Sequence, residues 1–88
     1  MNAFLLNVTS PDGTVFSDRA VKLSVRGVEG DLAVMAGHTP FITYLVPCTV
    51  KIELEDGKTL QGSVNSGLLT VSKEKVILLT GEISLKKS

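Results

Sequence analysis

Hydrophobic and polar residues alternate along several stretches of this 88-residue chain. A period of two is typical of strands that present one face to a core and the other face to water. The inward positions that it predicts are Val21, Leu23, Val25, Val50, Ile52, Leu54, Leu60, Gly62 and Val64. Residues 41–46 and 76–79 are more continuously apolar, which is expected of central strands or strands covered on both faces.

Turn residues separate these stretches. Asp56 and Gly57 lie between two alternating stretches and predict a two-residue hairpin, with both residues at positive φ. Residues 11–13, Pro-Asp-Gly, predict another turn, and residues 65–67 predict a bend or bulge rather than a reversal. No stretch has the period of a convincing amphipathic helix. The sequence therefore predicts an all-β sandwich or barrel of short strands.

Length and composition favour one domain over residues 1–88, because the chain has no room for two cores. Hydrophobic residues make up 43% of the chain and aromatic residues 5%. The core is therefore expected to be aliphatic, with the few phenylalanines inside it.

Charge and cysteine content narrow the class of partner. Nine basic and nine acidic residues cancel, so the chain has no electrostatic footprint for nucleic acid or an anionic membrane. Cys48 is the single cysteine, which excludes an internal disulfide and fits a reducing compartment. The first seven residues lack the pattern of a signal peptide, and no apolar run is as long as a membrane helix. These features predict a soluble intracellular protein.

Catalytic and ligand-binding patterns are nearly absent. His38 is the single histidine, and it has no further histidine or cysteine ligands for a metal beyond Cys48. Cys48 and His38 are conceivable as a nucleophile and base, but nothing else suggests an oxyanion hole. The acidic residues do not follow calcium-loop spacing, and Asp31 would repel a phosphate after Gly30. We therefore expect no catalytic, cofactor or metal residues, and a function in binding.

Residues 27–40 concentrate the chain's unusual features. Three glycines, Glu29, Asp31 and a Gly-His-Thr-Pro corner occur within fourteen positions. Loops of this kind on a rigid scaffold often form binding surfaces.

At this segment the chain resembles the epsilon subunit of rotary F-type ATP synthases, in its N-terminal β-sandwich domain. The resemblance covers essentially the whole chain, and its most specific part is the order Gly-x-x-Gly-Asp-Leu followed by Gly-His-x-Pro. The matching segments, in order, are residues 11–17, 21–25, 27–35, 37–43, Leu45, Pro47 and residues 66–71.

The resemblance implies a flattened two-sheet β-sandwich of about ten short strands. It implies a non-catalytic subunit of the central stalk that binds the gamma subunit and the c-subunit ring and helps couple proton or other ion translocation to ATP synthesis. It also implies a peripheral location on the cytoplasmic face of a bacterial inner membrane, with no insertion into the membrane.

Site residues follow from the resemblance position by position. Asp31, with Glu29 beside it, matches the family's contact to the polar loop of the c subunit; the alternative is a solvated turn acid. Ser10, His38 and Thr43 match positions on the gamma-facing side. His38 has an alternative role in stabilising its own turn, next to Pro40.

Three departures from the family pattern carry expectations of their own. The sequence stops at Ser88, before the two-helix hairpin that follows in most members, which predicts a subunit that binds no nucleotide and cannot inhibit hydrolysis by extending that hairpin. Cys48 stands where the family usually has glycine, and strain is expected there if the turn needs positive φ. Ser66 replaces the first glycine of a Gly-Gly pair, so backbone strain is expected there too if that bend needs positive φ.

Two other classes of binding protein remain as alternatives. A lipoyl- or biotinyl-carrier module is also a small β-sandwich, and it needs a modifiable lysine at a hairpin tip. Lys58 is the nearest candidate, but Gly57 and Thr59 flank it instead of the residues such a module uses. The second alternative is an unrelated β-sandwich adaptor. Composition does not separate it from the stalk subunit, and only the order of the motifs favours the stalk subunit.

Overall fold

Alternating apolar residues form strands throughout the computed structural model, which describes residues 3–87. Met1, Asn2 and Ser88 lie outside the described residues. Met1 and Asn2 belong to the segment examined for a signal peptide, and all three residues belong to the predicted domain of residues 1–88. The nine strands are β1 (Phe4–Ser10), β2 (Gly13–Gly27), β3 (Gly30–Val34), β4 (Phe41–Leu45), β5 (Cys48–Leu54), β6 (Thr59–Val64), β7 (Gly67–Val71), β8 (Lys75–Thr80) and β9 (Lys86–Lys87). No helix occurs in residues 3–87. The all-β prediction is confirmed, with nine strands where about ten were expected.

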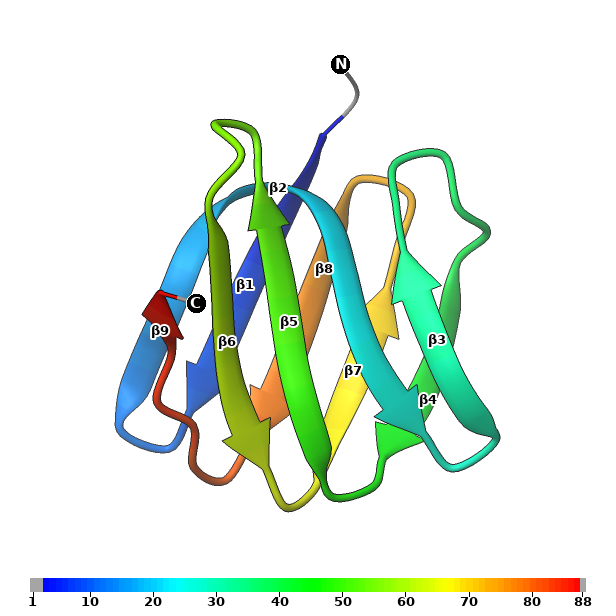
Figure 1. Cartoon of the computed structure of the whole chain (residues 1–88). Coiled ribbons are helices and arrows are strands. Elements are labelled where there is room, and N and C mark those ends of the chain that lie inside the picture. The colour runs from blue at the N-terminus through cyan, green and yellow to red at the C-terminus, as the bar shows by residue number, and fades with distance from the viewer. Residues whose placement is uncertain (1–2, 88) are drawn as a thin grey trace.

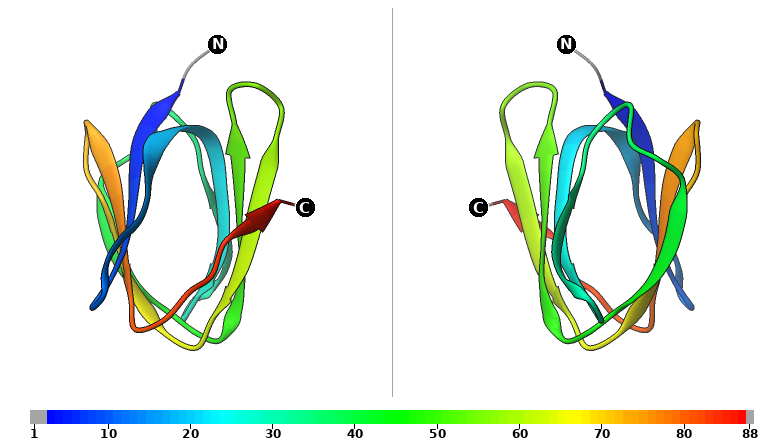
Figure 2. Two further views of the ribbon diagram at one scale, coloured as in Figure 1. Left: turned by 90° about the vertical axis from the view of Figure 1, so that its left-hand side faces the viewer. Right: turned by 90° about the vertical axis from the view of Figure 1, so that its right-hand side faces the viewer.

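The strands form two facing layers (Figures 1 and 2). One layer has the order β1-β8-β7-β4, and the other contains β5, β6, β9 and β3 around the second half of β2. The fifteen-residue β2 belongs to both layers, since its first half pairs with β1 and its second half with β5 and β3. Most pairs are antiparallel, whereas β1 and β8 run parallel.

The core lies between the layers and is aliphatic, as predicted. The fully buried large side chains come from both layers and are Leu6, Val8, Leu23, Val34, Val50, Ile52, Leu69, Val76 and Leu78. Val21 was predicted to face inward but is only half-buried. A register shift between Ala20 and Lys22 interrupts the alternation of β2, so Ala20 takes the buried position instead.

Of the two alternatives predicted for residues 41–46, a central strand or a strand covered on both faces, the second is wrong. In β4 the side chains of Ile42 and Tyr44 are 67% and 66% exposed. Leu79 of β8 is 43% exposed, although β8 lies centrally between β1 and β7. Nothing in residues 3–87 covers the outer face of this layer.

The hairpin between β5 and β6 also differs from the prediction. Gly57 has a φ of +87°, but Asp56 does not share a positive φ. The Gly57 amide donates to the Leu54 carbonyl (3.1 Å), and the Leu54 amide donates to the Lys58 carbonyl (2.9 Å). Residues 55–57 thus form a three-residue loop, in which one glycine supplies the left-handed position.

The two substitutions at glycine positions cause no backbone strain. Among residues 3–87, positive φ is confined to glycines. Cys48 begins strand β5 in an extended conformation, and Ser66 lies in the bend between β6 and β7. That connection takes the chain from one layer to the other and reverses its direction, since β6 runs downward and β7 upward in Figure 1, so the prediction of a bend or bulge without a reversal at residues 65–67 is wrong.

Candidate interaction surfaces

The hairpin of β2 and β3 holds the two predicted c-ring contacts together. Gly27 and Gly30 are opposite each other, and Val28 and Glu29 form the turn between them. Gly30 has a φ of +124°, which a residue with a side chain rarely adopts. The Val28 amide donates to the Tyr44 carbonyl (3.0 Å) and ties the turn to β4. Glu29 is exposed at the tip, and Asp31 is the second residue of β3.

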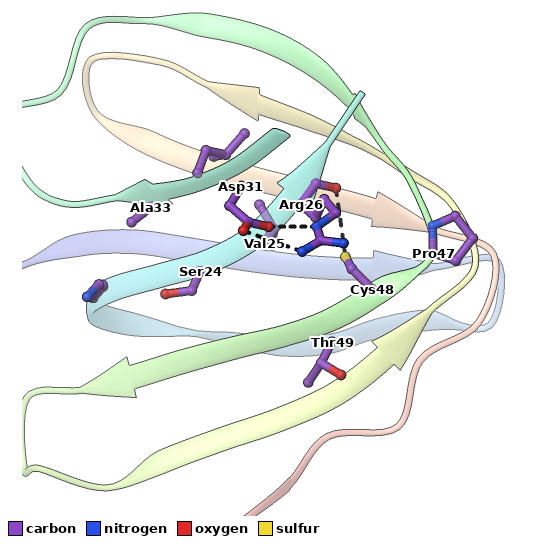
Figure 3. A pocket seen from close by; sticks show the side chains of 10 residues that line it. Ser24, Val25, Arg26, Asp31, Ala33, Pro47, Cys48 and Thr49 are labelled. Carbon is purple, nitrogen blue, oxygen red and sulfur yellow. Dashed lines mark hydrogen bonds and ion pairs between the residues drawn. The ribbon is translucent and has the colours of Figure 1, made fainter. Parts of the chain in front are cut away.

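Asp31 forms an ion pair with Arg26, which the sequence analysis did not identify. The two residues are directly opposite in the β2–β3 ladder. Arg26 Nε donates to Asp31 Oδ1 at 2.6 Å, and Nη2 donates to Oδ2 at 3.4 Å (Figure 3). The two-residue turn between Gly27 and Gly30 contained the signal for this pair, because such a turn places residues 26 and 31 opposite each other.

The ion pair lies at the surface and shifts both titrations. The side chain of Arg26 is 58% exposed and that of Asp31 is 75% exposed. The hydrogen bond from Arg26, followed by its positive charge, lowers the pKa of the Asp31 carboxyl. The same hydrogen bond and the charge of Asp31 raise the pKa of the Arg26 guanidinium. Asp31 is therefore an accessible, ionised carboxylate with one fixed cationic neighbour.

An open groove of about 630 Å³ adjoins the ion pair (Figure 3). It is lined by residues of β2, β3 and the start of β5, including Ser24, Arg26, Asp31, Cys48 and Thr49. The Cys48 thiol donates to the Arg26 carbonyl at 3.8 Å.

The structure does not bring Cys48 and His38 together as a nucleophile and base. Cys48 lies where β5 begins, at the lower end of the sandwich in Figure 1, whereas the β3–β4 connection that holds His38 lies at the upper end. Within the described chain, no three histidine, cysteine, aspartate or glutamate side chains are grouped to hold a metal ion.

His38 is engaged within its own loop. Its Nδ1 hydrogen-bonds to the Met35 carbonyl, and its ring meets Phe4 edge-on, with the centroids 6.1 Å apart. Nε2 is buried and has no hydrogen-bond partner in the part of the chain described. This geometry favours the turn-stabilising role for His38, and the ring nitrogens are not presented outward to a partner.

The three predicted gamma contacts are spread over the molecule. Ser10 ends β1 at the lower end, where its hydroxyl donates to the Gly13 carbonyl (3.4 Å), while the loop of His38 lies at the upper end (Figure 1). Thr43 is opposite the buried Leu69 and shares its inward face. Ser10 and Thr43 belong to β1 and β4, which are the two edges of the same layer.

An exposed apolar surface lies between those edges, on the outside of the layer. It consists of two cross-strand rows, Tyr44-Leu68-Leu79 and Ile42-Thr70-Ile77, which we call the outer apolar face. The rows continue into Thr9 and Asn7 of β1, so none of these eight positions carries a charge. Sequence reasoning missed this face because it interpreted the apolar run of residues 41–46 as a central strand or a strand covered on both faces. A contiguous exposed apolar patch is typical of an interaction site.

Comparison with known families identifies the class of protein to which the chain belongs. A sequence model of the family "ATP synthase, Delta/Epsilon chain, beta-sandwich domain" matches residues 3–86. The chain belongs to this family. The resemblance inferred from the motif order is thereby confirmed. The family assignment replaces the alternative of a lipoyl- or biotinyl-carrier module. Lys58, the candidate lysine for that alternative, does lie at an exposed hairpin tip.

Relatives with curated names agree with the family assignment. The ATP synthase epsilon chain of Wolbachia pipientis subsp. Culex pipiens (strain wPip) is 31% identical over 85 residues, which are 97% of this chain and 75% of the relative. The "ATP synthase epsilon chain, sodium ion specific" of Acetobacterium woodii is 33% identical over 91 residues, covering 97% of this chain and 68% of the relative.

Solved structures match the fold closely. A chain in the Euglena gracilis mitochondrial ATP synthase, in a structure of OSCP, F1 and c-ring, superposes with a TM-score of 0.88 and 26% identity. The match covers 94% of this chain and 53% of that chain, so this chain spans about half its length. A chain in the central stalk and c-ring of Tetrahymena thermophila ATP synthase matches in fold, with a TM-score of 0.76, 12% identity, and coverage of 94% and 66%.

Proposed function

We propose that this chain is a non-catalytic, central-stalk subunit of an F-type ATP synthase that docks on the gamma subunit and on the c-subunit ring. In this role it helps couple ion translocation to ATP synthesis. The observation that carries the proposal is the presence of two chemically different surfaces on a domain of this family, one apolar and one acidic. The solved structures support it, because the matching chains belong to ATP synthase assemblies that include the c-ring and, for Tetrahymena, the central stalk.

The outer apolar face is the proposed gamma-docking surface. Ile42 and Tyr44 are two-thirds exposed on a rigid strand that pairs with β7 along its whole length. Aromatic and aliphatic side chains of this kind supply most of the affinity at the centre of protein interfaces. Ser10, a proposed gamma contact, ends β1 at one edge of this layer, whereas Thr43 of β4 faces inward and is not part of this face. Docking there would remove the exposed side chains of Ile42, Tyr44 and Leu79 from water.

The lower end of the sandwich is the proposed c-ring surface. Figure 1 shows the β1–β2, β2–β3, β4–β5 and β6–β7 connections at this end, together with the segment after β8. These segments carry Asp12, Glu29 and Glu82 in addition to Asp31 near the start of β3. Exposed carboxylates accept charge-assisted hydrogen bonds from a polar loop such as that of the c subunit.

The proposed role as a stalk subunit of an ATP synthase predicts a peripheral location on the cytoplasmic face of a bacterial inner membrane. No helix within residues 3–87 is long and apolar enough to cross a membrane. The net charge of zero provides no general attraction to nucleic acid or to anionic lipid. We therefore expect the chain to reach the membrane through its protein partners, and to need no nucleotide or cofactor for docking.

Introducing a charge into the outer apolar face tests the gamma contact. Ile42→Asp is expected to weaken co-purification with the gamma subunit at least tenfold, because a carboxylate would be buried without a partner. Gln61→Asp introduces the same residue on an exposed strand of the opposite layer, and it is expected to bind gamma like the wild type. Equal binding by Ile42→Asp and the wild type, with both folded by circular dichroism, would exclude this face.

A further inference from the structure

We propose that Arg26 is the positioning residue for Asp31, and that the c ring is recognised by the Arg26–Asp31 pair rather than by a lone carboxylate. This inference rests on the proposed function. It assigns a role to Arg26 and specifies the chemistry of the ring segment that would dock there.

Arg26 is held more firmly than Asp31. Strand β3 is an edge strand that pairs with β2 alone, so Asp31 lies in a strand supported from one side only. Arg26 belongs to β2, and its carbonyl accepts hydrogen bonds from the Val46 amide (3.2 Å) and the Cys48 thiol (3.8 Å). The backbone of Arg26 is therefore tied to the connection between β4 and β5, while its guanidinium holds the side chain of an edge strand.

The geometry of the pair limits the directions that the carboxylate can take. Nε and Nη2 of Arg26 reach separate oxygens of Asp31, at 2.6 Å and 3.4 Å. Two donors from one planar group define the plane of the carboxylate as well as its position. A single Lys ammonium would act as a point charge and leave the carboxylate free to rotate.

The pair still has capacity to bind a partner. A carboxylate has about four lone-pair positions, and Arg26 occupies one on each oxygen. Since Asp31 is 75% exposed, the remaining positions are open to donors from outside. The complementary ring segment is therefore a polar loop that offers a donor side chain to these open positions of Asp31.

The surrounding charges do not replace Arg26. Lys22, on the same face of β2, is opposite Glu53 of β5 rather than Asp31. Glu29, at the tip of the turn, forms no ion pair within residues 3–87, so it does not compete for the guanidinium. Asp31 thus depends on one cation, and changing that cation is a clean test.

The test measures binding of the full chain to a purified c ring from the same organism, together with the titration of the Asp31 carboxyl by NMR. Asp31→Asn is expected to weaken binding at least tenfold through loss of charge-assisted hydrogen bonds. Arg26→Gln is expected to weaken it about fivefold and to return the pKa of Asp31 toward its ordinary value. Arg26→Lys keeps the charge without the two-donor geometry and should restore binding only in part.

A double variant separates positioning from stability. Exchanging the two residues, Arg26→Asp with Asp31→Arg, preserves an ion pair across the ladder but reverses its direction. The exchanged protein is expected to melt like the wild type and to lose ring binding.

The outcomes distinguish the two levels of the proposal. If the wild type does not bind the ring, or if Asp31→Asn binds equally well, the proposed c-ring contact fails. If Asp31→Asn binds weakly while Arg26→Gln binds like the wild type, the docking surface stands and the positioning role fails. Weak binding by Arg26→Gln with an unchanged pKa of Asp31 would show that Arg26 acts directly, which also overturns positioning.

Discussion

Asp31 shows how a single residue acquires its properties from the register of a hairpin. A carboxylate on a glycine-framed turn was predicted to be a free acceptor, and the structure pairs it with Arg26 instead. The partner follows from the turn length alone, because two turn residues place positions 26 and 31 on the same face of adjacent strands. His38 is the opposite case, since its contacts with Met35 and Phe4 depend on how the loop folds back over the core.

The Arg26–Asp31 pair predicts a pH dependence of stability. Arg26 lowers the pKa of Asp31 in the folded state, so the stabilisation is fully present above the ordinary aspartate value of about 3.9. It is lost as the pH falls through the lower folded value. Asp31→Asn is therefore expected to lower the urea midpoint at neutral pH and to match the wild type in strong acid.

Glu29→Gln is the matched control for this measurement. Glu29 lies in the same hairpin but forms no ion pair with any of residues 3–87, so its midpoint should follow the wild type at both pH values. A deficit of Asp31→Asn that persists in acid would assign the effect to hairpin packing rather than to the ion pair. High salt should reduce the difference at neutral pH, because both side chains are exposed.

At the scale of elements, alternation in the sequence predicts well which face of a strand is buried, but it predicts poorly where a bulge interrupts the strand. The inward positions Leu23, Val25, Val50, Ile52 and Val64 are all buried. The register shift in β2 had no sequence signal, because alternation is a local pattern and a bulge is determined by the partner strand. The exposure of β4 was missed for a different reason, since an apolar run is equally typical of a doubly covered strand and of a strand with one face at an interface.

The C-terminal segment depends on a close approach to β6. A Cβ at Gly62 would lie 2.6 Å from the carbonyl oxygen of Ser84 and 3.2 Å from the side chains of Ile83 and Leu85. Gly62→Ala is therefore expected to displace this segment, break the pairing of β6 with β9, and cost about 1–3 kcal/mol in unfolding free energy. Hydrogen exchange should become faster at residues 60–61 and 86–87.

Gly81→Ala serves as the control for this effect. Gly81 precedes the same segment, but a Cβ there meets no atom within 4 Å and its φ is not in the left-handed region. The control should therefore exchange like the wild type. Unchanged protection at residues 60–61 in Gly62→Ala would mean that the segment accommodates the methyl group without leaving β6.

On the scale of the whole molecule, the face proposed for docking is the opposite face of the strands whose inner face forms the core. In the layer of β4, β7 and β8, the inward side chains form the core, and the outward ones form the outer apolar face. Truncating a core residue should therefore reduce stability, whereas truncating an outward residue should reduce binding alone. Leu69 and Tyr44 provide the comparison, since Leu69 is fully buried and Tyr44 is two-thirds exposed in the adjacent strand.

Leu69→Ala is expected to lower the unfolding free energy by about 2–5 kcal/mol through the cavity that it leaves. Tyr44→Ser is expected to cost less than about 1 kcal/mol, because it removes only cross-strand contacts with Leu68 on a surface exposed to water. Urea denaturation measures both, and co-purification with gamma measures docking by the folded Tyr44→Ser protein. A loss of stability in Tyr44→Ser as large as in Leu69→Ala would mean that the outer apolar face serves the fold. A small loss of unfolding free energy in Tyr44→Ser, together with failure to bind gamma, would mean that the exposed apolar side chains of this face serve an interface.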